Sequence, residues 1–455
     1  MNTQLTAGVV GMTVTGLSLA GVLAEAGMTV LISDLDEEMV NAVSEEEIPG
    51  EEPGLRALTE KVVSNRKLIL CPNLRRVIRE CPVIFVTCMT PPDDAGRPGL
   101  RFATSIVRQI AAQCPEDRVV VLRLICGIGT VGKLQKTVDE ALADRQKDEE
   151  HVPAVRVATM PSLYDDGMMI ASLKRDGALA VGCDGDMPEE LKKVLNQLPA
   201  CDKRVYLTDS KTAEAAALAA SVRFAMRDVL HRETAAICGA AGISADEVFG
   251  VLDTHGKITR RLEAAHPLSP GFAGSRLAKE CDEWTDQARD VSVSAPLAKS
   301  IIRENKRSAE SVARYIKRAI KSIKAPIAVA GLAYAPATDD LRETPAVEAL
   351  KILGMPYAEI NPEAPKPFRL YLPTEGVQAK WRLFACRDAF DFCDGFAEAT
   401  QGAGALVILG RIPSLRLSPA LARRMSGNLI IDTVCQFNRQ KAEALGFDYR
   451  LLFEQ

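Results

Sequence analysis

A glycine turn near the amino terminus has residue types and spacing that suggest nucleotide chemistry. It reads Gly11-Met12-Thr13-Val14-Thr15-Gly16 and follows the short apolar segment Ala7 to Val10. A dinucleotide fingerprint places three glycines in such a turn, for the tight bend, the approach of a pyrophosphate and the packing of helix on strand. Gly11 and Gly16 keep two of these positions, and Thr13 replaces the middle glycine. The turn therefore predicts a nucleotide-binding βαβ unit with one defect.

Asp34 favours the binding of NAD, whereas Thr13 disfavours it. Asp34 follows the second apolar segment, where an acid accepts hydrogen bonds from an adenosine ribose and disfavours a 2′-phosphate, which indicates NAD. A threonine side chain projects where pyrophosphate and backbone should meet, and its β-branching restricts the turn. We therefore expect NAD, with binding weakened by Thr13. A plain Rossmann turn that holds no cofactor is the alternative.

Cysteine and histidine spacing indicates no metal site. The chain has 12 cysteines and no Cys-x-x-Cys pair. Its four histidines share no ligand spacing; they are His151, His231, His255 and His266. Scattered thiols in a long chain are typical of reduced, mostly buried cysteines, so we expect a cytoplasmic protein without a bound metal.

Composition narrows the class of protein further. The chain has 455 residues, of which 47% are hydrophobic and 25% charged, and its net charge is −4. This length predicts two to four domains. The charge balance gives no support for nucleic-acid binding. Neither a signal segment nor a long apolar run is present in the sequence, so we expect no membrane span.

Strands that alternate with helices position the turn in an α/β fold. Apolar strands are predicted at 7–10, 29–33, 83–87, 119–122 and 155–158, and again at 327–330, 405–409 and 429–432. An Ala-rich helix over Thr212 to Ala241 and a second helical stretch over 291–323 separate the two sets. We predict two doubly wound Rossmann-like domains, at 1–205 and 326–455, bridged by long central helices at 206–325.

Four further segments resemble, in order, the UDP-glucose/GDP-mannose dehydrogenase family. They are Glu47-Ile48-Pro49 with Glu52-Pro53-Gly54-Leu55, Thr90-Pro91-Pro92, Gly271-Phe272-Ala273-Gly274-Ser275, and the run from Gly331 through Asp339-Asp340-Leu341-Arg342-Glu343-Thr344-Pro345 to Ala346. The resemblance implies an NAD-binding first domain, a central dimerisation domain and a nucleotide-sugar-binding last domain. It implies cofactor contacts at Gly11, Thr13, Gly16, Asp34 and Thr90, and substrate contacts at Gly271, Phe272, Gly274 and Arg342.

The resemblance implies a two-step reaction in which NAD oxidises a sugar alcohol to a carboxylate. The reaction passes through a cysteine thiohemiacetal and a thioester. This chemistry needs a thiolate, groups that hold oxyanions and a carboxylate that moves protons. The matching positions hold Arg276 for the cysteine, Ala217 for a lysine, Ser221 for an asparagine and Ser162 for a glutamate. The loop lysine is kept as Lys279, and the aspartate after it is Glu280.

Other substitutions follow the same pattern. Where the resemblance implies a Ser-Thr pair, this chain has Leu124-Ile125, and where it implies a lysine, this chain has Ala335. The family's Asp-Gly-Arg-Asn motif is replaced by Asp432-Thr433-Val434-Cys435. Arginine is no nucleophile, because its guanidinium stays protonated. Cys126 and Cys281 are the alternative thiols, although each is more typical of a buried apolar cysteine. Candidate bases are Asp165, Asp166 and His255, which solvated turns explain equally well.

The sequence thus favours a member of this family that is catalytically inactive and acts by binding or oligomerising. Its expected partners are a nucleotide sugar and a second copy or an active relative. The alternative is an NAD-dependent oxidoreductase with altered chemistry on a UDP- or GDP-sugar. A third hypothesis is an active dehydrogenase whose catalytic residues lie at positions other than those matched above. Arg276 would hold a phosphate or carboxylate, or would pair with an acid such as Glu280.

Overall fold

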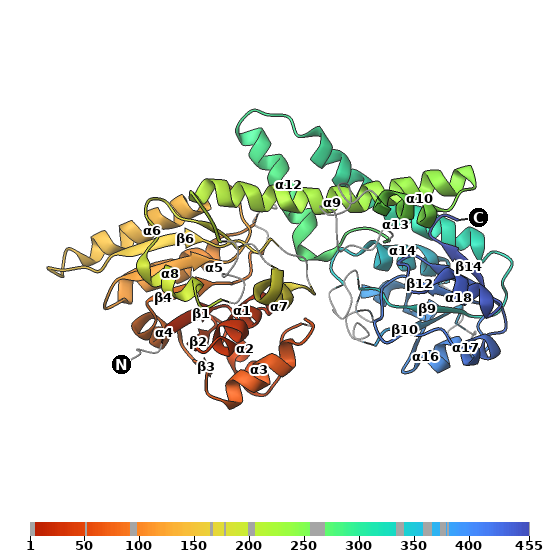
Figure 1. The fold of residues 1–455 in the computed structure, drawn as a ribbon, viewed down its shortest axis with the longest axis horizontal. Helices are drawn as coiled ribbons and strands as arrows, with labels where there is room; N and C mark the ends of the chain where they lie inside the picture. The colour runs from red at the N-terminus through yellow and green to blue at the C-terminus, as the bar shows by residue number, and fades with distance from the viewer. Residues whose placement is uncertain are drawn as a thin grey trace. The chain divides into compact units, whose positions relative to one another are not determined.

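The structure is a computed structural model that divides into two compact units (Figure 1). It describes residues 5–50, 52–91, 98–163, 167–176, 179–198, 205–254, 269–333, 341–357, 366–373, 379 and 382–454. One unit holds 1–221 and 282–294, and the other holds 222–281 and 295–455. Helices α9 (Ser210–Ala241) and α12 (Gly274–Asp290) each contribute to both units. The division into three domains stays a prediction.

The first unit contains an eight-stranded sheet with the order β3-β2-β1-β4-β5-β6-β7-β8. Its strands are β1 (Thr6–Val10), β2 (Thr29–Ser33), β3 (Leu68–Leu70), β4 (Val83–Val86), β5 (Arg118–Leu122), β6 (Val155–Thr159), β7 (Leu179–Gly182) and β8 (Val205–Thr208). Neighbours pair in parallel, except that β6 and β7 are antiparallel. The chain reverses its direction of growth between β1 and β4. Ligands of open α/β sheets bind at such a switch point.

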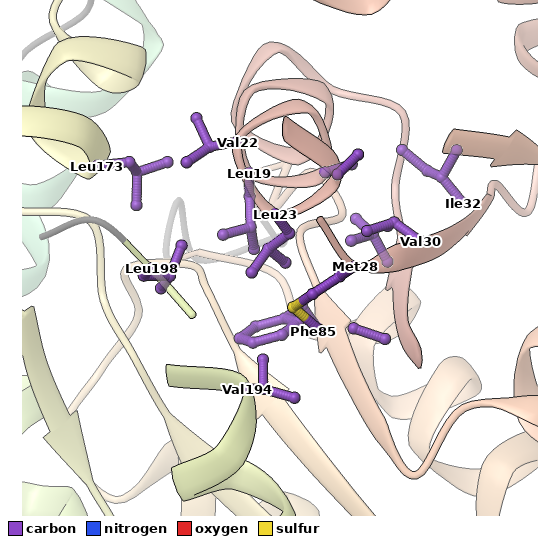
Figure 2. Close-up of a cluster of buried hydrophobic side chains, with 14 of the residues drawn as sticks. Leu19, Val22, Leu23, Met28, Val30, Ile32, Phe85, Leu173, Val194 and Leu198 are labelled. Atoms are coloured by element: carbon purple, nitrogen blue, oxygen red, sulfur yellow. The ribbon is translucent and has the colours of Figure 1, made fainter. Parts of the chain in front are cut away.

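Helices link the strands of this unit and bury both faces of the sheet. They are α1 (Val14–Glu25), α2 (Glu37–Ser44), α3 (Leu55–Ser64), α4 (Leu74–Glu80), α5 (Arg101–Gln113), α6 (Thr130–Arg145), α7 (Met169–Ala171) with a π-helical turn (Ser172–Asp176), and α8 (Glu189–Leu195). Figure 2 shows Leu19 and Leu23 of α1 near Phe85 of β4. Each such buried side chain contributes about 1.5–3 kcal/mol.

The second unit contains a six-stranded parallel sheet with the order β11-β10-β9-β12-β13-β14. Its strands are β9 (Ile327–Ala330), β10 (Phe368–Tyr371), β11 (Phe390–Cys393), β12 (Ala405–Ile408), β13 (Leu429–Asp432) and β14 (Asp448–Leu451). Alternate residues of β9 enter two separate cores: Ile327 and Val329 one, Ala328 and Ala330 the other. The sheet is therefore buried on both faces, as a doubly wound fold requires.

The helices of the second unit surround this sheet and extend from it. They are α10 (Ala245–Thr254), α13 (Pro296–Ala319), α14 (Pro345–Gly354), α16 (Phe396–Thr400), α17 (Pro419–Arg424) and α18 (Arg439–Ala444), with short 3₁₀ turns at Met355–Tyr357 and Phe384–Ala389. No helix among the described residues is long and apolar enough to cross a bilayer.

The predicted fold is confirmed, with shifted element boundaries. The strands predicted at 327–330 and 429–432 agree with the structure. The helix predicted over 291–323 is shorter, because proline at its first position starts α13 at Pro296. Helix α12 already begins at Gly274, inside the segment predicted as a glycine-rich loop. Strands β7 and β8 extend the first sheet beyond the predicted strands.

Candidate functional site

The glycine turn packs tightly against the end of β4. Gly11 has a φ of +117°, and a Cβ atom there would lie 2.7 Å from the Cys88 nitrogen and the Thr87 carbonyl carbon. Only glycine fits this position without strain. The hydroxyl of Thr87 donates to the Gly11 carbonyl at 2.8 Å. The turn predicted from the sequence therefore forms, and it lies at the switch point between β1 and β4.

Thr13 is the N-cap of α1. Its hydroxyl accepts the Gly16 N–H at 3.1 Å and donates to the Thr87 carbonyl at 3.0 Å. The N–H groups of a first helical turn are what a Rossmann fold presents to a pyrophosphate. One of these donors is already satisfied here by a side chain of the turn itself.

Asp34 fixes the shape of the same turn. One carboxylate oxygen accepts the Met12 N–H at 2.6 Å, and the other accepts the Asp36 N–H at 3.1 Å. An ionised carboxylate has about four acceptor sites, so room for ribose hydroxyls remains. Thr90 lies in the segment after β4.

Basic residues are absent from the sequence around this turn, since the first lysine or arginine of the chain is Arg56. The described residues therefore fit the ribose end of NAD. At the pyrophosphate end, the Thr13 hydroxyl already occupies the Gly16 donor.

An apolar cluster occupies the positions where the resemblance places a lysine and a threonine. Ile125 and Ala217, which replace them, form its buried centre together with Leu218. Ala217 is 1% exposed and Ile125 is 8% exposed. Partly buried side chains complete the cluster: Ile128, Leu163 and Trp284. These residues offer neither an ammonium group nor a hydroxyl.

The two serines at former polar positions are also buried. The Ser221 hydroxyl donates to the Ala217 carbonyl at 3.1 Å, one turn earlier in α9. Ser162 follows β6 and is largely buried. Asp165, Asp166 and His255 lie outside the described residues. Serine supplies neither the amide of asparagine nor the carboxylate of glutamate.

Glu214 connects α9 to the start of α6. Its two carboxylate oxygens accept the N–H groups of Gly129 at 2.6 Å and Val131 at 2.8 Å. Burial raises the pKa of Glu214, although these two bonds oppose the shift. The side chain therefore acts as a remote helix cap and positions the loop between β5 and α6.

A second buried acid, Glu283 of α12, faces that loop. Its Oε1 accepts from the Gln287 amide at 2.7 Å, and a Cβ atom on Gly127 would collide with the same oxygen. Its Oε2 is buried without a hydrogen-bond partner among the described residues. Sequence reasoning did not identify Glu283, because nothing in its local motif distinguishes it from a solvated helix face.

The alternative thiols do not have the properties of nucleophiles. Burial, with smaller contributions from the nearby Glu214 and Glu283, raises the pKa of Cys126 to about 12. Cys281 lies on α12, as predicted, and is fully buried. A nucleophilic cysteine instead needs a lowered pKa and access to its substrate.

Asn305 of α13 holds the glycine-rich loop in the second unit. Its Oδ1 accepts the Phe272 N–H at 3.0 Å, and its amide donates to the Phe272 carbonyl at 2.8 Å. Gly271 has a φ of +143°, and a Cβ atom there would lie 2.6 Å from the same Oδ1. The loop thus keeps its backbone shape through a residue that sequence reasoning missed, 33 positions away.

The other predicted residues of this loop belong to α12. Gly274 is its first residue, and Arg276 lies in its first turn, with a side chain outside the described set. Lys279 is partly buried, and Glu280 is buried. Arg342 lies exposed before α14.

Asp432, in the segment that replaces the family's Asp-Gly-Arg-Asn motif, has a structural role. It accepts the Tyr449 hydroxyl at 2.7 Å and the Val434 and Phe437 N–H groups. No metal-binding group of His, Cys, Asp or Glu occurs among the described residues.

Two family models match the chain across both units. The NAD binding domain of the UDP-glucose/GDP-mannose dehydrogenase family matches residues 5–198, and the central domain of that family matches residues 211–307. The chain belongs to the UDP-glucose/GDP-mannose dehydrogenase family. The resemblance seen in the sequence is thereby confirmed.

Individual relatives are distant but extend over most of the chain. A UDP-glucose 6-dehydrogenase of Rhizobium meliloti is 26% identical over 460 residues and covers 98% of each chain. A GDP-mannose 6-dehydrogenase of Pseudomonas putida is 26% identical and covers 76% of this chain and 78% of its own. The solved structure of a UDP-glucose dehydrogenase from Pyrobaculum islandicum has a TM-score of 0.80 at 19% identity, covers 99% of this chain and 98% of its own, and supports the fold.

Proposed function

We propose that this member of the UDP-glucose/GDP-mannose dehydrogenase family is catalytically inactive and acts by binding a nucleotide sugar or by oligomerising. The apolar cluster around Ala217 and Ile125 carries the proposal. A thiohemiacetal oxyanion needs fixed donors, and the loss of one such donor costs about 2.7–4 kcal/mol of transition-state stabilisation. Buried alkyl groups at these positions supply none.

Three other substitutions support the same conclusion. Arg276, Ser221 and Ser162 stand where the family chemistry uses a thiol, an amide and a carboxylate. Penalties for groups that act together are not additive. With the nucleophile and its supporting groups all replaced, no route to a thioester remains.

We propose that NAD binds this chain weakly. The Thr13 hydroxyl competes with phosphate for the Gly16 N–H, while Asp34 keeps the position of a ribose acceptor. The nucleotide-sugar end of the chain keeps more of its frame, since Asn305 maintains the Gly271–Phe272 backbone. Binding of the sugar nucleotide therefore does not depend on the cofactor turn.

Self-association is the second part of the proposal. We propose a homodimer, or a pair with an active relative, formed through α9. Ala213 is buried against Gly182 of the same chain, so it is not available to a partner helix. Leu230 and Ile237 of α9 are exposed and provide an apolar face instead.

Glu283 favours the alternative of altered chemistry. It is a buried carboxylate with one unpartnered oxygen beside the β5–α6 loop. A carboxylate in such a place can accept a proton from an alcohol during a single NAD-dependent oxidation of a UDP- or GDP-sugar. If the chain has this activity, Glu283→Gln should abolish it. If the chain is an inactive binder, the same variant should keep its ligand affinity.

Calorimetric titration of the purified chain with UDP-glucose and with NAD tests the binding proposal. We expect saturable binding of UDP-glucose and weak binding of NAD, with Asn305→Ala reducing only the former. If UDP-glucose gives no heat and light scattering shows a monomer, both modes of action that we propose are wrong.

A further inference from the structure

Helix α9 carries a buried arginine whose guanidinium is incompletely paired. Arg232 is 7% exposed. Its Nη2 donates to the Glu304 carbonyl at 3.2 Å, and its Nη1 is buried without a hydrogen-bond partner among the described residues. Both residues belong to the second unit.

This arrangement costs free energy that the protein cannot avoid by a proton transfer. A buried carboxylate can become neutral by binding a proton. An arginine side chain stays charged at any physiological pH, and a buried charge without a partner destabilises a fold by several kcal/mol. An anion that reaches Arg232 would remove this cost.

Among the described residues, the acids whose charges act on Arg232 also pair with other arginines. Glu304 of α13 is one acid whose charge acts on Arg232, yet its Oε1 pairs with Arg303 at 3.2 Å and Arg307 at 3.3 Å. Two other guanidinium groups thus share the Glu304 carboxylate, while Arg232 donates to the backbone carbonyl of the same residue. Asp228, one turn before Arg232, is the second acid whose charge acts on it, and Asp228 itself lies 3.6 Å from the Arg227 Nε.

We propose that Arg232 is the anchor of an oxyanion site for a phosphate group, formed where α9 meets α13. A planar guanidinium offers paired donors that match two phosphate oxygens, and charge-assisted bonds of this kind are about twice as strong as neutral ones. A phosphate also supplies negative charge where Glu304 and Asp228 already pair with other arginines. The inference does not rest on the proposed function, because any phosphorylated small molecule would satisfy it.

The site also has a defined frame. Asn305, next to Glu304 in the chain, holds the Gly271–Phe272 loop. The neighbouring His231 packs edge-on against Phe249 with ring centroids 5.0 Å apart. The residues that follow Glu304 and precede Arg232 in the chain are therefore held by packing and hydrogen bonds, which limits the entropy lost when an anion binds.

Thermal unfolding and calorimetry with inorganic phosphate and pyrophosphate test this site, at ionic strength matched with sodium chloride. The variants are Arg232→Met, which keeps the apolar stem, and Arg314→Met as a control that removes an exposed arginine of α13. We expect phosphate to raise the Tm of the wild type and of Arg314→Met, and to leave Arg232→Met unchanged. Without phosphate, Arg232→Met should have a higher Tm than the wild type and Arg314→Met, because it removes the buried charge.

A second variant keeps the test decisive if Arg232→Met does not fold. Arg232→Lys retains the charge and loses the planar fork, so its phosphate affinity should fall about tenfold. Tighter binding of pyrophosphate than of phosphate would identify a diphosphate as the ligand, and the reverse a single phosphate. The proposal is wrong if phosphate does not stabilise the wild type, or if either Arg232 variant binds phosphate as the wild type does.

Discussion

The Thr13 hydroxyl accepts the Gly16 N–H at 3.1 Å, so the side chain that replaces the middle glycine of the fingerprint also satisfies a donor of the anion-binding turn. We propose that this single residue both stabilises α1 and weakens the interaction of the turn with phosphate. These two effects can be separated by substitution.

Thr13→Gly should tighten NAD binding. It frees the Gly16 N–H for a phosphate oxygen, a charge-assisted bond of about 1.5–3 kcal/mol, or tenfold or more in affinity. Replacing a threonine N-cap by glycine lowers stability by about a few tenths of a kcal/mol. Calorimetry measures the affinity, and urea unfolding measures the stability.

Thr13→Ser is the matched control, because it keeps the capping hydroxyl and should bind NAD as weakly as the wild type. Asp34→Ala in the Thr13→Gly background should weaken NAD binding again by removing the ribose acceptor. Tight NAD binding by the wild type, unaffected by these changes, would contradict our interpretation of the turn.

Ala217→Lys should destabilise the first unit strongly. The new ammonium group would be buried among the apolar side chains of Ile125, Leu218 and Trp284, at a cost of about 3–5 kcal/mol. Ala216→Lys places the same side chain at the exposed neighbouring position and should change stability little. Equal unfolding free energies for the two variants would show that the site is open and polar.

Glu214→Gln should change the pH dependence of stability. Burial raises the pKa of Glu214 above its usual value of 4.5, so the folded state binds this proton more tightly than the unfolded state. Its contribution is fully present below pH 4.5 and is lost as pH rises through the folded pKa. The unfolding free energy of the wild type relative to the variant should therefore fall between acidic and neutral pH. A constant difference would refute this.

Light scattering at micromolar concentration should show a dimer. Leu230→Glu combined with Ile237→Glu places two charges on the exposed apolar face of α9 and should give a monomer. Val293→Glu, at an exposed position outside α9, is the control and should leave the dimer intact. A wild-type monomer would exclude self-association at this concentration.

The sequence was sufficient for the fold and for the location of the cofactor turn. Period-two and helical patterns are local, so the strands at 327–330 and 429–432 and the helix α9 could be predicted within a few residues. The edge strand β8 is mostly exposed, with Tyr206 and Leu207 facing outwards. Its apolar run, Val205 to Leu207, is only three residues long, which is too short to identify a strand from the sequence pattern.

The contacts that build the site were not predictable, because they join distant parts of the chain. Glu214 caps a helix whose first residues are 83 to 85 positions away, and Asn305 holds a loop 33 positions away. The substitutions themselves were visible as residue types. That Ile125 and Ala217 meet in one apolar cluster with Trp284 required the structure.

Absorbance at the NADH band, with NAD and several UDP- and GDP-sugars, tests catalytic inactivity most directly. We expect no NADH from the wild type, and none from Arg276→Cys, because Ala217, Ser221 and Ser162 still lack the amine, amide and carboxylate that a thiohemiacetal requires. Turnover by Arg276→Cys alone would show that Arg276 is the main block. Sustained NADH formation by the wild-type protein would contradict the proposed function.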